Sequence, residues 1–215
     1  MKVTVLCSDE RHSKWPGLAD WVAARRSGTT ELVTRVGQAQ GGDILFLISC
    51  SEMVRADVQA RYRNTLVIHA SSLPQGRGWS PHVWAILEGR NRICVTLLEA
   101  AEKVDAGAIW AQREVALEGH ELWDEIAAAI GAAEFELMEW AIAMAETVVP
   151  QPQTEDGATY YRRRAPADGE LDVNCSIAAQ FDLLRVSDPY RYPAFFDYRG
   201  HRYAVRIEKQ DKENA

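Results

Sequence analysis

Residues 67–81 read VIHASSLPQGRGWSP, and this stretch determines how the chain around it is expected to fold. The apolar residues before it predict a buried strand that ends at His69. Ser80 and Pro81 have the residue types of an N-cap and of the first position of a helix. His69 is therefore expected where a strand leaves a sheet, which is where α/β proteins often carry their chemistry. A structural histidine with satisfied hydrogen bonds is the simpler interpretation of these residues alone.

Apolar runs alternate with helical patterns along the first 150 residues, which predicts a parallel-rich sheet covered by helices. The expected strands are 2–7, 43–49, 65–69 and 93–98, and the expected helices are 16–26, 53–61, 81–88 and 120–147. The segment VVPQPQTEDGATYY, with its two prolines and a glycine, marks the exit from this domain. We therefore expect one domain over 1–150 and a small C-terminal domain over 151–215. The last part of the tail is expected to form two short strands around Arg199-Gly200.

The 215 residues are 47% hydrophobic and 26% charged with a net charge of −7, an ordinary composition for a globular protein. This acidic balance argues against a broad nucleic-acid-binding face, although the basic run at 162–164 can serve a single anionic ligand. The four cysteines show no CxxC spacing and are interpreted as reduced residues of a cytoplasmic protein. The apolar part of MKVTVLCSDE is too short for a signal peptide, and no apolar run approaches the length of a membrane span. Neither a nucleic acid nor a membrane is expected as a partner.

The sequence contains no GxGxxG, P-loop, GxSxG or HExxH motif, and its five histidines do not cluster with acidic residues at metal-ligand spacing. A metal site is therefore not expected. Among the remaining candidates are His69 and Asp105, which follows the expected strand 93–98. If the two strands are neighbours, the imidazole can face the carboxylate, an arrangement suited to acid–base chemistry at neutral pH. An aspartate before Ala-Gly is equally typical of a turn.

Two longer segments, HASSLPQGRGWSPHVWAILEG and VTLLEAAEKVDAGAIWAQ, resemble the folate-dependent formyltransferases that act on glycinamide ribonucleotide, methionyl-tRNA and nucleotide sugars. The matching positions are His69, Leu73-Pro74, Arg77-Gly78, Ser80-Pro81 and Asp105-Ala106-Gly107. The resemblance covers residues 43–115 well, and the first strand and the long helix in outline. It implies an α/β fold with a Rossmann-like, parallel-rich sheet of the formyltransferase type and a small C-terminal α+β tail domain.

The resemblance also implies a reaction in which 10-formyltetrahydrofolate donates its formyl group to a primary amine. His69 would donate to the oxyanion or carry the proton, and Asp105 would orient His69 and help to deprotonate the amine. The pterin is expected between segments 49–53 and 100–105. The expected folate contacts are Ser49, Cys50, Met53, Ala100, Ala101, Lys103 and Asp105. A plain core role for Cys50 and Met53 stays open.

One position departs from the family pattern. The family usually has an asparagine two residues before the histidine, which donates to the formyl oxygen, whereas this chain has Val67. Asn64 lies at the far end of the expected strand, so Ser49, Ser71 or a water would have to substitute. Loss of such a donor typically costs about 2.7–4 kcal/mol. A folate-binding protein with weak or no transferase activity is therefore a second hypothesis.

The tail, with RRRAPADGELD and DPYRYPAFFDYRG, resembles the segment that follows the core of nucleotide-sugar N-formyltransferases. Arginines suit a diphosphate and aromatic rings can stack on a base. The expected acceptor contacts are Ser71, Arg77, Trp79, Arg162, Arg164, Tyr190, Tyr192 and Phe196. A glycinamide ribonucleotide enzyme is the alternative, since the chain length fits it, whereas methionyl-tRNA enzymes carry a larger C-terminal domain. A structural cap whose aromatic residues form its own core is the alternative role of the tail.

The glycine and the tryptophan that follow Arg77 are similar to the branch associated with pseudaminic-acid-type sugars. The implied acceptor is UDP-linked 4-amino-4,6-dideoxy-N-acetyl-altrosamine, formylated at its 4-amine. The product would enter bacterial surface glycans such as O-antigen or glycosylated flagellin. A homodimer is left open.

Overall fold

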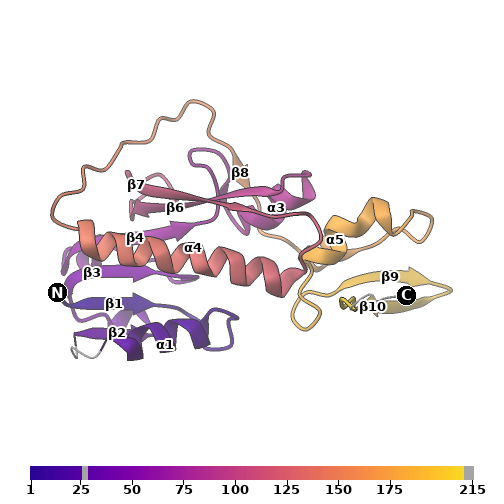
Figure 1. Ribbon diagram of the computed structural model, residues 1–215, viewed down its shortest axis with the longest axis horizontal. Helices are drawn as coiled ribbons and strands as arrows, with labels where there is room; N and C mark the ends of the chain where they lie inside the picture. The colour runs from indigo at the N-terminus through magenta and orange to yellow at the C-terminus, as the bar shows by residue number, and fades with distance from the viewer. Residues whose placement is uncertain (26–28, 211–215) are drawn as a thin grey trace.

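The computed structural model describes residues 1–25 and 29–210 (Figure 1). Its centre is a six-stranded sheet with the strand order β2-β1-β3-β4-β6-β7. These strands are β1 (Val3–Leu6), β2 (Thr30–Val33), β3 (Gly42–Leu47), β4 (Tyr62–His69), β6 (Arg92–Glu99) and β7 (Ile109–Ala116). The first four are parallel, and β6 and β7 run antiparallel to their neighbours. The expected α/β fold with a parallel-rich sheet is confirmed.

Helices cover both faces of this sheet. One face packs against α1 (Trp15–Ala24), α3 (Pro81–Leu87) and the long α4 (Trp123–Met144), which runs roughly along the direction of the strands in Figure 1. The other face packs against the short α2 (Ala56–Gln59), whose Val58 is buried in the second apolar cluster. The buried residues of α4 recur at helical spacing, which is why the sequence pattern predicted this helix. They include Ile126, Ile130, Ala133, Leu137 and Ala141.

Some elements differ from the sequence prediction. The expected helix over 53–61 shrinks to the four residues of α2, and the edge strands β2 and β7 were not predicted. Edge strand β7 buries only Trp110 and Val115, and Gln112, Arg113 and Glu114 interrupt its apolar residues, so it contains no long apolar run. Ser80 holds the N-cap position of α3 but is left-handed (φ 48°), and its side chain makes no cap hydrogen bond. Residue 26, the last of another expected helix, lies outside the described residues. Within the described ranges, no helix is both long and apolar enough to cross a membrane.

After α4 the chain arcs around the β7 edge of the sheet as a segment without helix, residues 149–161, which we call the strap (Figure 1). The strap ends in β8 (Tyr160–Tyr161), which pairs in parallel with β5 (Arg77–Gly78). The remaining tail contains α5 (Phe181–Val186) and the hairpin of β9 (Ala194–Tyr198) and β10 (His201–Val205), which confirms the two expected strands.

The tail is tied to the core by a buried arginine of α5. The Arg185 side chain is only 1% exposed and donates to Asp182 at 2.6 Å and to Asn91, next to β6, at 2.7 Å. The division of the chain into a domain over 1–150 and a second one over 151–215 stays a prediction, since the strap packs on the first of them.

Candidate active site

His69 and Asp105 lie together at the end of β4. His69 Nδ1 is 3.6 Å from Asp105 Oδ2, and both side chains are buried, with 9% and 8% of their surface exposed. From the sequence, the two residues were expected to meet because the ends of strands 65–69 and 93–98 would lie side by side, and the structure differs on this point. Because β4 and β6 are antiparallel, Asp105 reaches the histidine through the loop 100–108, which folds back from the end of β6. The sequence hypothesis thus predicted the proximity from a geometry that the sheet does not have.

The loop 100–108 holds Asp105 in a constrained position. Asp105 has a left-handed backbone (φ 54°), and its Oδ2 accepts a hydrogen bond from the backbone N–H of Gly78 at 2.9 Å. A Cβ atom on Gly107 would lie 1.9 Å from the carbonyl oxygen of Glu99, so no larger residue fits there without moving the loop. These contacts fix the carboxylate that faces the imidazole.

The hydrogen bond of the second ring nitrogen of His69, Nε2, shows which of the two ring nitrogens carries the hydrogen. Nε2 lies 2.8 Å from the carbonyl oxygen of Gly76. A carbonyl oxygen only accepts, so Nε2 carries the hydrogen and Nδ1 of the neutral ring offers its lone pair on the side of Asp105. The ring orientation is therefore set by Gly76, and the carboxylate is placed to stabilise a proton taken up at Nδ1.

The glycines around Arg77 explain the unusual motif between the strand and the helix. Gly78 has φ 99°, and a Cβ atom there would lie 2.3 Å from the carbonyl oxygen of Tyr161. Only glycine permits this close approach, which lets β5 pair with β8. The backbone N–H groups of Arg77 and Trp79 then donate to the strap carbonyls of Thr159 and Tyr161.

The pairing buries the Arg77 side chain completely, with 0% exposed. Its guanidinium donates to Glu155 at 3.1 and 3.2 Å, to Gln153 at 2.9 Å and to the hydroxyl of Tyr160 at 3.0 Å. Lys103 and Arg77 together lower the pKa of Glu155. Arg77 was predicted to contact the acceptor, but in this structure its guanidinium is committed to the strap.

Gln153 connects this arginine to the loop of Asp105. Its Oε1 accepts from Arg77, and its Nε2 donates to the carbonyl oxygens of Asp105 at 3.0 Å and Gly107 at 2.7 Å. Nearby, the hydroxyl of Thr159 accepts from the backbone N–H of Gly76, the residue that orients His69. The strap therefore holds both loops of the candidate site.

The predicted folate contacts lie in two neighbouring segments beside Val67. Cys50, Ala100 and Val67 pack against the same apolar cluster on one face of the sheet. Burial raises the pKa of the Cys50 thiol, which keeps it neutral. The others are spread around them: Ser49 and Ala101 are exposed, Met53 is 66% exposed, and Lys103 Nζ donates to Glu155 at 2.6 Å. Their role in folate binding stays a prediction.

The predicted acceptor contacts fall into separate places. Ser71 is next to the histidine, and its buried Oγ has no hydrogen-bond partner among the described residues. Arg162 pairs with both carboxylate oxygens of Asp168, and Arg164 donates to the carbonyl oxygen of the same residue. Trp79 is 49% exposed and lies under the guanidinium of Arg163. The structure does not bring these arginines to the catalytic pair.

The remaining predicted contacts lie farther along the tail. Tyr190 and Tyr192 line a surface hollow, whereas Phe196 stacks on Tyr203 of the hairpin at 5.3 Å. The binding role of all three stays a prediction.

Sequence reasoning missed the loop that follows β1. His12 and Lys14 of this loop interact electrostatically with His82 of α3, which also interacts with His69. Lys14 Nζ pairs at 2.5 Å with Glu134, a buried residue of α4. A histidine and a lysine two residues apart, just after the first strand, were the available signal, but a polar loop after a strand is too common to single out.

No group of three or more histidine, cysteine or acidic residues in the described ranges has an arrangement that could hold a metal ion.

Comparison with known proteins gives a family. The family model described as formyl transferase matches residues 2–142, about two thirds of the chain. Among solved structures, a methionyl-tRNA formyltransferase from Clostridium thermocellum is similar with a TM-score of 0.82 at 18% identity, covering 98% of this chain and 94% of that one. From the sequence, methionyl-tRNA enzymes were expected to carry a larger C-terminal domain, but almost the whole of that structure is matched by this chain.

Two further structures share the fold. A sugar N-formyltransferase from Shewanella has a TM-score of 0.69 at 15% identity, with 99% of both chains covered. HypX from Aquifex aeolicus in complex with tetrahydrofolic acid has a TM-score of 0.76 at 20% identity, with 96% of this chain and 37% of HypX covered. At these identities the likeness establishes the fold of the chain.

Replacement of Gln153 by alanine should loosen the loop 100–108. Two hydrogen bonds to this loop, of about 0.5–1.5 kcal/mol each, are lost together with one acceptor of the Arg77 guanidinium, so local opening should increase roughly tenfold to a hundredfold. Hydrogen exchange at the amides of Ala106 and Glu99 would measure it. Gln151→Ala is the matched control, because that side chain donates only to Val149 in the strap itself. Equal exchange in the two variants would show that Gln153 does not hold the loop.

Two half-buried imidazoles near the site, those of His12 and His82, predict loss of stability in mild acid. Burial, with a contribution from Lys14, lowers the pKa of His12 from 6.5 to about 4 and that of His82 to about 3. Below pH 6.5 the unfolded chain binds protons that the folded protein excludes, so stability should fall as the pH drops toward 4. Urea unfolding between pH 4.5 and 7 would measure the slope. His12→Gln should flatten it by about one proton, whereas His201→Gln, on the exposed hairpin, should not. An unchanged slope in His12→Gln would contradict this assignment.

Proposed function

Because this chain belongs to the formyl transferase family, we propose that it moves a formyl group from 10-formyltetrahydrofolate to the 4-amine of a nucleotide-linked amino-dideoxy sugar. The observation that carries the proposal is the buried pair of His69 and Asp105 at the end of β4, held in place by the strap. Tetrahydrofolic acid bound to HypX supports a folate-type donor, and the full-length match to a sugar N-formyltransferase supports the acceptor class.

The site residues account for the proton movements that this reaction needs. The amine attacks the formyl carbon, a C–N bond forms, and the carbonyl electron pair moves to oxygen. The amine loses a proton, which His69 can take up at Nδ1, beside the Asp105 carboxylate. Collapse of the intermediate breaks the bond to the folate nitrogen, and the same proton can go to that leaving group. The buried pair excludes bulk water from this exchange.

The finer acceptor assignment is UDP-4-amino-4,6-dideoxy-N-acetyl-altrosamine, used in the cytoplasm for bacterial surface glycans. It is supported by the tail motif DPYRYPAFFDYRG and by the residues around Arg77. The net charge of −7 favours a small anionic acceptor over tRNA.

Val67 favours one alternative, a folate-binding protein with weak transferase activity. Its side chain lies in the apolar cluster with Cys50 and Ala100 and offers no hydrogen-bond donor to the formyl oxygen. Val67→Asn distinguishes the two functions, because a restored donor should accelerate a slow transferase.

Incubation of the purified protein with 10-formyltetrahydrofolate and the UDP-4-amino sugar tests the proposal. Mass spectrometry should show a sugar nucleotide in which a formyl group has replaced one hydrogen. Binding of both ligands without this product would favour the binding protein, and faster formylation of glycinamide ribonucleotide would identify the other acceptor class.

Replacement of either member of the catalytic pair should reduce turnover by about a hundredfold or more, because acid–base groups typically contribute 10²–10⁴. Asp105→Asn keeps an oxygen that can accept from Gly78, so the loop should stay folded. The double variant His69→Asn/Asp105→Asn should be much less than additive if the two act as a unit. His201→Gln is the control for loss of an unrelated imidazole. Near-normal kcat in both single variants would rule out the mechanism.

A further inference from the structure

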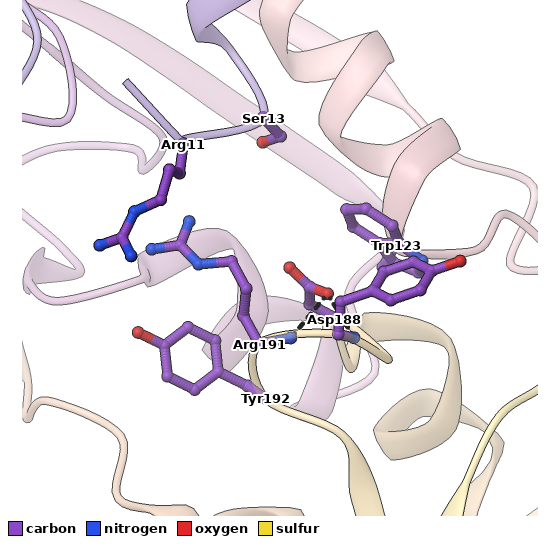
Figure 2. Close-up of a pocket in the computed structure, with 7 residues that line it drawn as sticks. Arg11, Ser13, Trp123, Asp188, Arg191 and Tyr192 are labelled. Carbon is purple, nitrogen blue, oxygen red and sulfur yellow. Dashed lines mark hydrogen bonds between the residues drawn. The ribbon is translucent and has the colours of Figure 1, made fainter. Parts of the chain in front are cut away.

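A surface hollow lies between the loop after β1 and the loop after α5. It has a volume of about 510 Å³ and is lined by residues of both loops and by Trp123, the first residue of α4. Figure 2 shows the guanidinium groups of Arg11 and Arg191 reaching into the same space from opposite sides. The core and the tail therefore each contribute one cation to this hollow.

The two guanidinium groups share a single carboxylate. Asp9 Oδ1 is 3.2 Å from Arg11 Nε, and Asp9 Oδ2 is 3.2 Å from Arg191 Nη2. The Arg11 side chain is 90% exposed and that of Arg191 is 38% exposed, so both can be reached from solvent. A diphosphate offers more acceptor oxygens and more negative charge than one carboxylate, and arginine binds phosphate in a bidentate manner.

A second carboxylate, that of Asp188, also lines the hollow but has a structural role. Asp188 Oδ1 accepts from the backbone N–H groups of Tyr190 and Arg191 at 2.8 and 3.1 Å, the dashed lines of Figure 2. These bonds shape the turn that presents Tyr190, Arg191 and Tyr192. Asp188 therefore shapes the loop, and Asp9 is the counter-ion of the two arginines.

Aromatic surface lies beside the cations. Tyr190 is 75% exposed and Tyr192 is 61% exposed, which is high for such large rings. Tyr190 meets Trp123 edge to face, with 6.3 Å between the ring centres. Arg206 lies over the Tyr190 ring at 5.4 Å, and Arg191 lies over the Tyr192 ring at 5.7 Å. Exposed aromatic side chains beside guanidinium groups match a ligand with a planar base and an anionic group, since stacking on a base is insensitive to which base it is.

His12 and Lys14, on the loop that carries Arg11, and His69 each act electrostatically on His82 of α3. In the basic run of the tail, Arg162 donates to both carboxylate oxygens of Asp168 at 2.7 and 2.5 Å, and Arg164 donates to the carbonyl oxygen of that residue. Arg11 and Arg191 each make one longer contact of 3.2 Å with Asp9.

We propose that this hollow binds the nucleoside diphosphate part of the acceptor, with Arg11 and Arg191 exchanging Asp9 for the diphosphate and with Tyr190 and Tyr192 covering the base. This inference rests on the proposed function, since it assigns a binding site to the nucleotide part of that acceptor. It assigns the diphosphate to residues of two loops rather than to the run at 162–164.

Calorimetric titration of the full chain with UDP and dTDP tests the proposal. Arg11→Ala and Arg191→Ala should each raise the Kd roughly tenfold to a hundredfold, the range for a charge-assisted contact. Asp9→Asn should lower the Kd severalfold, because the competing carboxylate is gone. Arg92→Ala, which removes an exposed arginine paired with Glu114 on the sheet, is the matched control.

Inorganic pyrophosphate and UDP together distinguish the contribution of the two arginines from that of Tyr190. Inorganic pyrophosphate should lose affinity in the arginine variants and not in Tyr190→Ala, whereas UDP should lose affinity in all three. A Kd for UDP that is unchanged in both arginine variants, or that rises only in Arg162→Ala, would overturn the inference and leave the proposed function intact. Absence of binding of any nucleotide to the unaltered protein, together with no formylated sugar nucleotide, would overturn both.

Discussion

The completely buried guanidinium of Arg77 is the interaction on which the rest of the candidate site depends. An unpaired charge in that position would be costly, so the chain must bring acceptors to it. It does so with Glu155, Gln153 and Tyr160, all from the strap. The arginine thereby fixes a segment that would otherwise be an irregular connection between α4 and the tail. Since Lys103 also binds Glu155, the loop 100–108 is held from a second side.

The geometry of the catalytic pair follows from this arrangement. His69 takes its orientation from the carbonyl of Gly76, whose own N–H is held by Thr159 of the strap. Asp105 is held by Gly78 through its carboxylate and by Gln153 through its carbonyl. Both groups are thus positioned by residues outside β4 and β6. A sheet with β4 and β6 antiparallel could not place Asp105 beside His69 by strand order alone, and the loop with its left-handed aspartate makes the connection.

The sequence predicted the buried elements well, because apolar runs and helical spacing report burial directly. It missed β7, an edge strand whose apolar residues are interrupted by Gln112, Arg113 and Glu114, and it assigned Arg77 to the acceptor. A glycine-bracketed arginine reads as an anion-binding group when its partners are unknown. Those partners lie 76 to 83 residues later, in a segment whose prolines and glutamines read as a linker. The pairing depends on Gly78 meeting the Tyr161 carbonyl, a contact between distant segments that no local pattern encodes. The loop after β1 was missed for a related reason, since its charges gain meaning only beside α4 and the tail.

These contacts bear on where the activity resides in the chain. The family match ends at residue 142, inside α4, and includes both members of the catalytic pair. Gly76 and Gly78 hold the pair from within that match. Gln153 and Thr159 of the strap hold the two loops from outside it, and Arg191 of the tail shares Asp9 with the loop after β1. A chain that ended after α4 would leave the Arg77 guanidinium without its acceptors, and the loop 100–108 without its hydrogen bonds from Gln153. The part that matches the family therefore contains His69 and Asp105, whereas the strap holds the loops that position them.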